Sequence, residues 1–321
     1  MKNKILYLFV LTSLLSFSQT EQESYAKVSK LFCSEFNAEN YQAIFDLFDS
    51  NMKAALPKER TLYFFKNNVA PAGKIEKMEF SELKQTAHIY KTTFEKGVFD
   101  ILISLNTENE INGFYVKPHI PKNLPVVERN TTKMILPFNE EWTVGWGGIT
   151  VEDNYHVAHN NQKYAYDLFM TKDGKTFEGN AKKNENYYVF GKQIIAPCDA
   201  SVVKVIKGVK DNIPGELNPA QVTGNTVILK TENDEFILFA HFKENSIRVM
   251  ENQIVKQGDI LGLCGNSGNS TEPHLHLSLQ NVSDMNMATG GKLFFDKIEV
   301  NGEIKENYIP IKNEKIKNTD L

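Results

Sequence analysis

The stretch that decides the fold is residues 272–279, EPHLHLSL, in which apolar residues alternate with polar ones. A period of two is typical of a β-strand, whose successive side chains point to opposite faces. His274 and His276 therefore share one face, while Leu275 and Leu277 point to the other. An H-x-H pair alone is a weak signal for a metal, since two half-exposed polar residues on a sheet give the same pattern. The pair becomes informative only with partners from other segments.

Two other segments supply candidate partners. FILFAHF, residues 236–242, predicts a strand in which the polar His241 follows an apolar run. NYHVAHNNQKYAYDLFM, residues 154–170, carries three further candidates: His156, His159 and Asp167. Asp167 stands among apolar neighbours on a predicted strand, and an unpaired buried carboxylate is costly. Either a metal ion or a salt bridge to Lys163 is therefore expected beside it.

These groups together suit a catalytic zinc site. Two histidines and one aspartate leave the fourth position of a zinc ion open for water, which is the catalytic arrangement. The metal lowers the pKa of its water and polarises a carbonyl. A second pair of imidazoles can take the water proton or stabilise the developing oxyanion. The predicted β-domain holds the required number of groups, three ligands and two spare histidines.

Segments in this region resemble the lysostaphin-type zinc endopeptidases that cut peptidoglycan cross-links. They are IIAPCDASVVKV at 194–205, FAHF at 239–242, VKQGDILGLCG at 255–265 and GNSGNSTEPHLHLSL at 265–279. Their order and the H-x-H loop are specific only in combination. The resemblance implies Zn²⁺ as the cofactor and a role for four residues: Asp167 and His276 as ligands, His274 beside the metal on the attacking water or the oxyanion, and His241 as the other non-ligand histidine.

The first ligand departs from the family pattern. The family's H-x-G-x-D motif places a histidine four residues before the aspartate, where this chain has Lys163. The segment instead resembles a variant group that reads N-Y-H-V, a short insert, then Q-[KR]-Y-A-Y-D. That match implies His156 as the ligand, with His159 as the rival. Phe239 stands where the family often has a tyrosine, which removes a possible hydroxyl donor to the oxyanion. Glu272 replaces a glycine and adds a carboxylate at the mouth of the site.

The chain is predicted to be multidomain, with a small α+β domain before an all-β peptidase domain built as a folded antiparallel sheet with long loops. Helical spacing of apolar residues extends to about residue 70, and a strand meander with a hairpin around residues 107–110 follows. This order weakly resembles nuclear-transport-factor-like, cystatin-like cone domains. The predicted parts are a signal peptide at 1–19, the α+β domain at 20–117, a linker at 118–131, the zinc peptidase β-domain at 132–285, and a C-terminal strand extension and tail at 286–321.

Composition and the N-terminal sequence limit the cellular location and the binding partners that the protein can have. The net charge of −4 does not indicate a nucleic-acid partner. Lys2 and Lys4 precede a short apolar run at residues 5–15, which predicts a cleaved signal peptide, no stable membrane span and a periplasmic or secreted protein. The polar residues 312–321 are expected to fray. His88 and His119 have no clustered partners and are expected to be surface or turn residues.

The function predicted from these features is an exported zinc metalloendopeptidase acting on peptide cross-links of peptidoglycan. The alternative is a non-catalytic wall-binding or hydrolase-activating module of the same fold. Such relatives usually lose ligands, whereas this chain keeps a complete candidate set. A zinc deaminase would need a C-x-x-C ligand pair, and a two-metal nuclease would need clustered carboxylates near the histidines. The sequence has neither feature.

Overall fold

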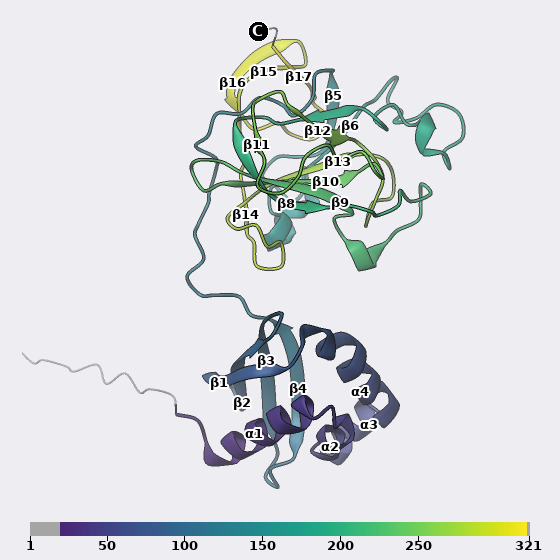
Figure 1. Cartoon of the computed structure of the whole chain (residues 1–321). Coiled ribbons are helices and arrows are strands. Elements are labelled where there is room, and N and C mark those ends of the chain that lie inside the picture. Colours follow the sequence, from purple (N-terminus) through teal and green to yellow (C-terminus); the bar gives the residue numbers. More distant parts are fainter. Residues whose placement is uncertain (1–19, 320–321) are drawn as a thin grey trace, which may run out of the picture. The chain divides into compact units, whose positions relative to one another are not determined.

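The structure is a computed structural model that describes residues 20–319. The signal peptide predicted for residues 1–19 lies outside the described residues. The chain divides into two compact units between Ile120 and Pro121, and each has its own hydrophobic core (Figure 1). Within residues 20–319, we find no helix that is long and apolar enough to cross a membrane. An α+β unit followed by a β-rich unit confirms the predicted fold class.

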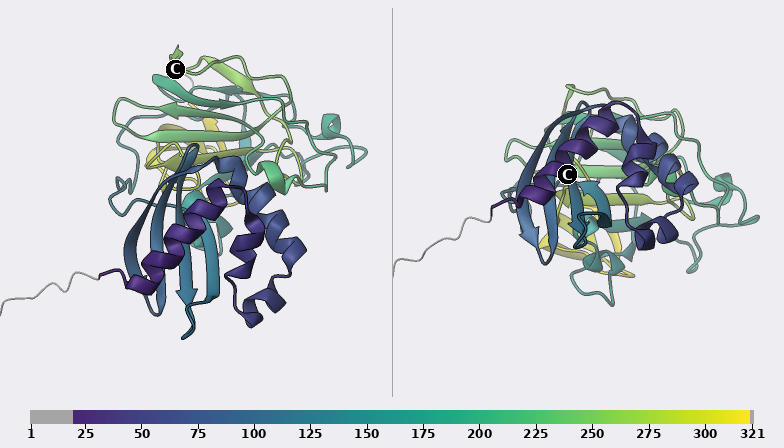
Figure 2. Two further views of the ribbon diagram at one scale, coloured as in Figure 1. Left: turned by 60° about the horizontal axis from the view of Figure 1, so that its bottom comes forward. Right: turned by 90° about the horizontal axis from the view of Figure 1, so that it is seen from below.

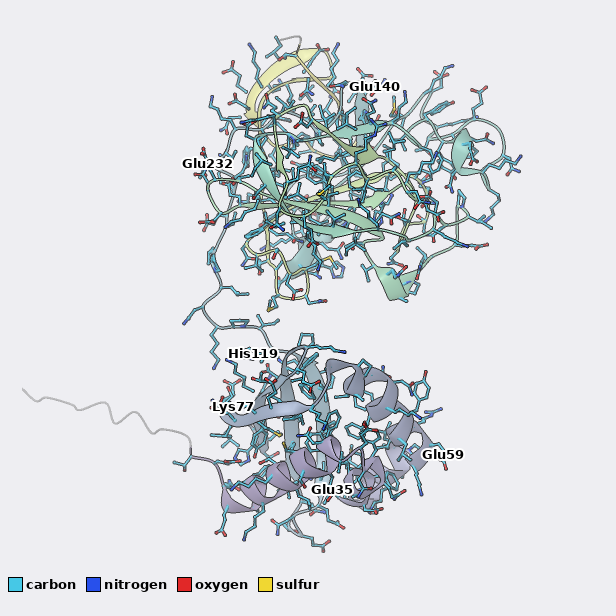
Figure 3. All side chains as sticks on the ribbon, in the orientation of Figure 1. Glu35, Glu59, Lys77, His119, Glu140 and Glu232 are labelled. Carbon is cyan, nitrogen blue, oxygen red and sulfur yellow. The ribbon has the colours of Figure 1, made fainter. Side chains whose placement is uncertain are left out.

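Helices form the first part of the N-terminal unit. They are α1 (Glu23–Asn37), α2 (Tyr41–Asp46), α3 (Ser50–Ala55) and α4 (Lys58–Phe64), followed by η1 (Phe65–Val69) and η2 (Ala70–Ala72). The helix α3 begins where Asp49 accepts the backbone N–H of Met52 at 2.7 Å, which is an N-cap. The buried side chains of α1 recur at helical spacing, so this helix packs through one face. Glu59 of α4 projects outward instead (Figure 3).

An antiparallel sheet completes this unit, with its strands in chain order. The strands are β1 (Ile75–Lys84), β2 (Ala87–Phe94), β3 (Gly97–Leu105) and β4 (Ile111–Pro118). The helix α1 lies across one face of the sheet (Figure 2), and aromatic rings dominate the core between them: Phe32, Phe36, Phe48, Phe65 and Phe94. The hairpin between β3 and β4 turns at residues 106–110, which confirms the predicted meander.

His88 on β2 is not the surface or turn residue that the sequence suggests. Its ring is fully buried, with centroid distances of 3.7 Å to Tyr25 and 4.9 Å to Phe80. Neither ring nitrogen has a hydrogen-bond partner among residues 20–319. Burial lowers the pKa of His88, since the charged form would lose its hydration. The prediction fails because Tyr25 belongs to α1, whose packing onto β2 leaves no mark in the local sequence.

The C-terminal unit is built on one large antiparallel sheet. Its strand order is β11-β8-β9-β10-β13-β6-β5-β17-β15-β16, and β14 pairs with β13. The strands are β5 (Trp142–Trp146), β6 (Tyr166–Phe169), β8 (Ala200–Ile206), β9 (Asn225–Lys230), β10 (Phe236–Phe242), β11 (Ile254–Val255), β13 (Leu275–Gln280), β14 (Gly290–Gly291), β15 (Phe295–Val300), β16 (Glu303–Tyr308) and β17 (Lys315–Asn318). A second, two-stranded sheet pairs β7 (Gln193–Ile195) with β12 (Ile260–Leu263).

Short 3-10 turns and long loops join these strands. The turns are η3 (Tyr155–Ala158), η4 (Asn160–Gln162), η5 (Asn184–Asn186) and η6 (Pro219–Gln221). On β13, the side chains of Leu275, Leu277 and Leu279 belong to the core cluster. The alternation of a strand therefore turns His276 away from this core.

Residues 315–318 of the C-terminal tail form a strand of the large sheet and are not frayed. The strand β17 lies between β5 and β15, where Ile316 pairs with Trp142 on one side and Val300 on the other. The side chain of Ile316 is fully buried. The expectation of fraying for residues 312–321 rests on their polarity and is wrong for β17. Pairing with two neighbouring strands satisfies the backbone of a segment whose composition looks like a tail.

Candidate metal centre

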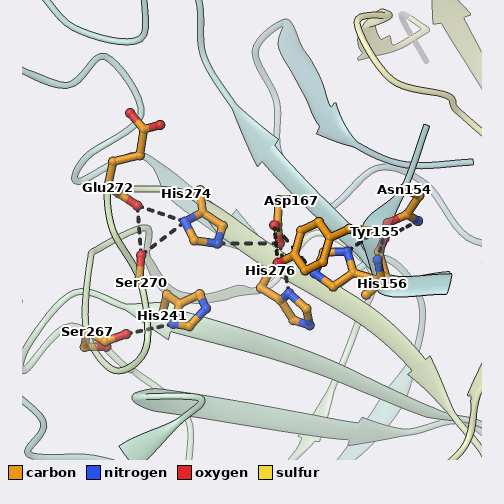
Figure 4. Close-up of polar contacts among 11 residues, drawn as sticks. Asn154, Tyr155, His156, Asp167, His241, Ser267, Ser270, Glu272, His274 and His276 are labelled. Atoms are coloured by element: carbon orange, nitrogen blue, oxygen red, sulfur yellow. Dashed lines mark hydrogen bonds and ion pairs between the residues drawn. The ribbon is translucent and has the colours of Figure 1, made fainter. Parts of the chain in front are cut away.

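Three neighbouring strands bring the polar residues of the site together. In the antiparallel register, His276 of β13 lies opposite Asp167 of β6 and opposite Ala240 of β10. His274 directly precedes β13, and His241 follows Ala240 on β10. Residues far apart in the sequence thus meet on adjacent strands (Figure 4).

A β-bulge aims His241 at the site. The pairing of β10 with β9 shifts register between Phe239 and Phe242, and His241 has a left-handed backbone with φ of 64°. Residues 239 and 241 would share a face in a regular strand, but a bulge re-aims side chains. Phe239 is fully buried in the core, whereas His241 lines the pocket. A tyrosine at position 239 would point into the core, so Phe239 does not cost the site a hydroxyl donor.

His156, Asp167 and His276 form a compact group of possible metal ligands (Figure 4). One ligand atom from each lies within 4.8 Å of the others, and all three residues are buried. The Asp167 carboxylate has its Oδ1 at 2.9 Å from His276 Nδ1 and its Oδ2 at 3.6 Å from His156 Nε2. Lys163, the alternative partner for this carboxylate, instead has its Nζ 5.1 Å from the ring centroid of Tyr164.

The loop before β6 presents His156 and not His159 to this group. Asn154 is fully buried, and its Oδ1 accepts both the backbone N–H of His156 at 3.2 Å and the ring Nδ1–H at 2.9 Å. This contact leaves the lone pair of His156 on Nε2, which faces Asp167. His159 is exposed at the pocket rim, with its ring centroid 6.4 Å from that of Tyr155, and it is not a member of the group.

His241 and His274 flank the group without belonging to it. The Nδ1–H of His241 donates to the Ser267 carbonyl at 2.7 Å, and that of His274 donates to the Glu272 carbonyl at 2.8 Å. Because a carbonyl oxygen only accepts, both rings keep a free lone pair on Nε2 when neutral. The two ring centroids lie 4.7 Å apart, and His274 Nε2 is 3.5 Å from Asp167 Oδ1.

Burial and proximity shift the pKa values of these groups in different directions. Burial lowers the pKa of His241 well below its usual range and lowers the pKa of His156 to about 4. Burial alone would raise the pKa of Asp167, but the neighbouring imidazoles, with His274 foremost, hold it well below its usual range. The site therefore presents an ionised carboxylate and neutral His156, which are the forms that bind a metal.

The sequence pattern does not single out Tyr155 and Trp146, which form one wall of the site. The hydroxyl of Tyr155 donates to Asp167 Oδ2 at 3.4 Å, and its ring centroid lies 4.0 Å from that of His156. Trp146 packs edge-on against Tyr155 at 5.2 Å. The N-Y-H-V motif could have indicated Tyr155, because Asn154 and Tyr155 directly precede His156 in it.

A pocket of ≈ 400 Å³ opens over this group of side chains. Its lining includes the rings of Trp146, Tyr155 and Phe169, together with His241 and His274. Pockets of this size commonly bind small molecules or parts of longer ligands. The flanking imidazoles can therefore reach a molecule held beside Asp167.

The donor set fits a zinc ion. His156 Nε2 is buried and has no hydrogen-bond partner among the described residues. It faces the ionised Asp167 carboxylate, and His276 lies on the other side of that carboxylate. Zinc prefers this combination of imidazole nitrogen and carboxylate oxygen. A cation here would satisfy the orphaned nitrogen and neutralise the buried charge.

Two parts of the chain match known protein families. Residues 187–288 match peptidase family M23, and residues 29–114 match DUF3887, a family of unknown function. Endolysin 2638A of Staphylococcus phage 2638A is 28% identical over 125 residues, which are 35% of this chain and 26% of the endolysin. The chain thus spans about a quarter of the length of this relative.

Solved structures with similar domains have low identity. The catalytic domain of lysostaphin from Staphylococcus simulans is 21% identical with a TM-score of 0.28, and the match covers 46% of this chain and 86% of that one. A mutant catalytic domain of the prophage-encoded M23 protein EnpA from Enterococcus faecalis is 18% identical with a TM-score of 0.31, over 49% and 94% of the two chains.

The family match includes three of the site histidines, His241, His274 and His276, whereas His156 and Asp167 precede its first residue. The part of the site nearest the family pattern is therefore the H-x-H strand and its neighbour β10. On the match over residues 187–288, the chain contains a peptidase family M23 domain.

Proposed function

We propose that this protein is an exported zinc metalloendopeptidase that hydrolyses peptide cross-links of peptidoglycan. The observation that carries the proposal is the convergence of three ligand atoms, from His156, Asp167 and His276, within 4.8 Å beneath a pocket. The match to peptidase family M23 supports peptide hydrolysis. The endolysin relative and the resemblance to lysostaphin-type enzymes support a cell-wall substrate.

His156, Asp167 and His276 would hold the metal. A zinc ion supplies Lewis acidity, which activates water and polarises the amide carbonyl. His241 is oriented to accept a proton on Nε2, because Ser267 holds its Nδ1–H. His274 is oriented in the same way by Glu272, so its Nε2 can exchange a proton with the attacking water or donate to the developing oxyanion.

The proposal of export rests on the N-terminal sequence. Residues 1–15 combine two lysines with a short apolar run, which is the pattern of a cleaved signal peptide. A peptidase with a peptidoglycan substrate must reach the periplasm or the cell exterior. N-terminal sequencing of protein recovered from outside the cytoplasm, starting near Gln19, would support this part of the proposal.

The purified mature protein tests the function directly. It should contain about one zinc per chain and should release cross-link peptides from isolated sacculi. His276→Ala removes a ligand and should abolish both zinc binding and peptide release. Cleavage that persists in this variant would contradict the proposal. A metal-free protein that stimulates another hydrolase would instead favour the non-catalytic module.

A further inference from the structure

The pocket contains one carboxylate that the proposed reaction does not use, Glu272. It stands two residues before His274, and its side chain is half-buried in the pocket lining. Figure 4 shows its carboxylate pointing away from the imidazoles, on the far side of the backbone carbonyl that holds His274. The side chain and the backbone of Glu272 therefore face different parts of the site.

Among the described residues, Glu272 has no lysine or arginine partner. Its Oε2 accepts the hydroxyl of Thr176 at 2.8 Å, and it forms no ion pair with any residue from 20 to 319. A hydroxyl orients a carboxylate but does not neutralise it. The two carboxylate oxygens accept about four hydrogen bonds, so most of this capacity remains free. A half-buried anion of this kind favours a cationic partner.

The nearest titratable ring, His274, faces the Asp167 carboxylate through its Nε2 at 3.5 Å. No lysine or arginine lines the pocket in the part of the chain that the structure describes. The other carboxylate of the lining is Asp167, which is enclosed by imidazoles and belongs to the metal group. The Glu272 carboxylate therefore has no lysine or arginine beside it in the pocket and can be reached by a ligand.

We infer that Glu272 is a specificity residue that binds a primary ammonium group of the peptide substrate. This inference rests on the proposed function of the same pocket. Because Glu272 and the metal group lie at one pocket, the ammonium group belongs to a residue near the scissile bond. A peptide offers this group in two places, the free α-amine of its first residue and the side chain of a diamino acid.

The substitution Glu272→Gln isolates the charge. The amide keeps the size of the side chain, and the backbone carbonyl that orients His274 and accepts the Ser270 hydroxyl at 2.8 Å is unchanged. Glu232→Gln is the matched control, since Glu232 lies exposed in the turn between β9 and β10 (Figure 3) and does not line this pocket. Both variants remove one negative charge.

The experiment compares zinc-loaded full-length protein on peptides that differ only in their amines. One peptide has a free α-amine, one has an acetylated terminus and a diamino side chain, and one has all amines acetylated. We expect kcat/KM of the wild type to be at least about ten-fold higher for one of the amine peptides than for the blocked peptide, because hydrogen bonds to charged groups have about this effect. The preferred amine identifies the source of the ammonium group.

The variants decide the role of Glu272. Glu272→Gln should reduce the ratio between amine and blocked peptides to near one, while Glu232→Gln should keep the wild-type ratio. Higher ionic strength should lower the wild-type ratio by screening. An unchanged ratio in Glu272→Gln, or an equal loss on all peptides, would overturn the inference.

Failure of the proposed function gives a different result. If the wild type cleaves none of the peptides, the peptidase assignment fails and binding of the same peptides decides the role of Glu272. Tighter binding of an amine peptide by the wild type than by Glu272→Gln would then support ammonium recognition. Equal binding by the two proteins would contradict it.

Discussion

At the scale of single residues, three histidines are each held through Nδ1, so that Nε2 carries the lone pair when the ring is neutral. His241 and His274 donate their Nδ1–H to backbone carbonyls. His156 donates to Asn154 Oδ1, and the orientation of this amide is fixed because its Nδ2 donates to two backbone carbonyls, 3.1 and 2.9 Å away. The tautomers are thus set before any ligand binds, which would avoid reorganisation in the proposed reaction.

Asn154→Ala should weaken zinc binding. The change removes the acceptor that fixes the His156 ring and the amide that ties the loop to the backbone of Gly148 and Ala165. Loss of such a supporting contact commonly lowers metal affinity by about 10- to 100-fold. Competition with a chromophoric chelator measures the affinity. Asn160→Ala, an exposed position in the same loop, is the control, and equal affinities for the two variants would contradict the assignment.

Separate substitutions of the two loop histidines should distinguish the first ligand. His156→Ala removes a buried nitrogen that faces Asp167, so zinc content after dialysis should fall well below one per chain. His159→Ala changes an exposed ring outside the ligand group and should retain the metal. Elemental analysis of both proteins gives the answer. Metal loss confined to the His159 variant would reverse the assignment.

At the scale of elements, the C-terminal strands support one wall of the pocket. The strand β17 pairs with β5, and β5 ends at Trp146, which lines the pocket. Lys312 lies just before β17, with its Nζ 3.5 Å from the Trp146 ring centroid. Trp146 in turn packs on Tyr155. The C-terminal extension therefore contacts the site indirectly, through β5 and the rings of Trp146 and Tyr155.

Local periodicity was enough to predict the elements that surround the site. The alternation in β13 correctly predicted that Leu275 and Leu277 face the core. Periodicity could not reveal the bulge in β10, because a register shift depends on the partner strand. For this reason the sequence wrongly suggested that Phe239 removes a hydroxyl donor from the site. The pairing of β17 was missed for the same physical reason, since backbone hydrogen bonds to distant strands leave no periodic signal in a polar segment.

Acid should destabilise the N-terminal unit through His88 on β2. Burial keeps the pKa of this ring below its ordinary value of about 6.5, although Glu21 opposes the shift. At a pH between the pKa of His88 in the folded state and its higher pKa in the unfolded state, the unfolded state binds more protons. The free energy of unfolding therefore falls as pH drops below about 6.5, by at most about 1.4 kcal/mol per pH unit. Thermal unfolding over a pH series tests this. The slope should weaken in His88→Leu, and an identical slope would contradict the role of His88.

At the scale of the whole molecule, the main hydrophobic core of each unit is separate from that of the other. The core of the N-terminal unit is dominated by aromatic residues from its helices and its four-stranded sheet, and the core of the C-terminal unit comes from the strands of the large sheet and its loops. No residue belongs to both clusters among those described. Since cooperativity follows the contacts of a core, we expect two thermal transitions in calorimetry.

Zinc should stabilise only the transition of the C-terminal unit, because the ligand group lies entirely within residues 156–276. A ligand that binds only the folded state at 100 times its Kd adds about 2.7 kcal/mol. For a unit of this size, that free energy corresponds to a rise in Tm of roughly 5–10 °C. Calorimetry with zinc and with a chelator measures the shift, and the transition whose pH dependence weakens in His88→Leu identifies the N-terminal unit. Asp167→Asn, which removes the anionic ligand, should lose the zinc-dependent rise, and a rise that persists in this variant would place the bound metal elsewhere.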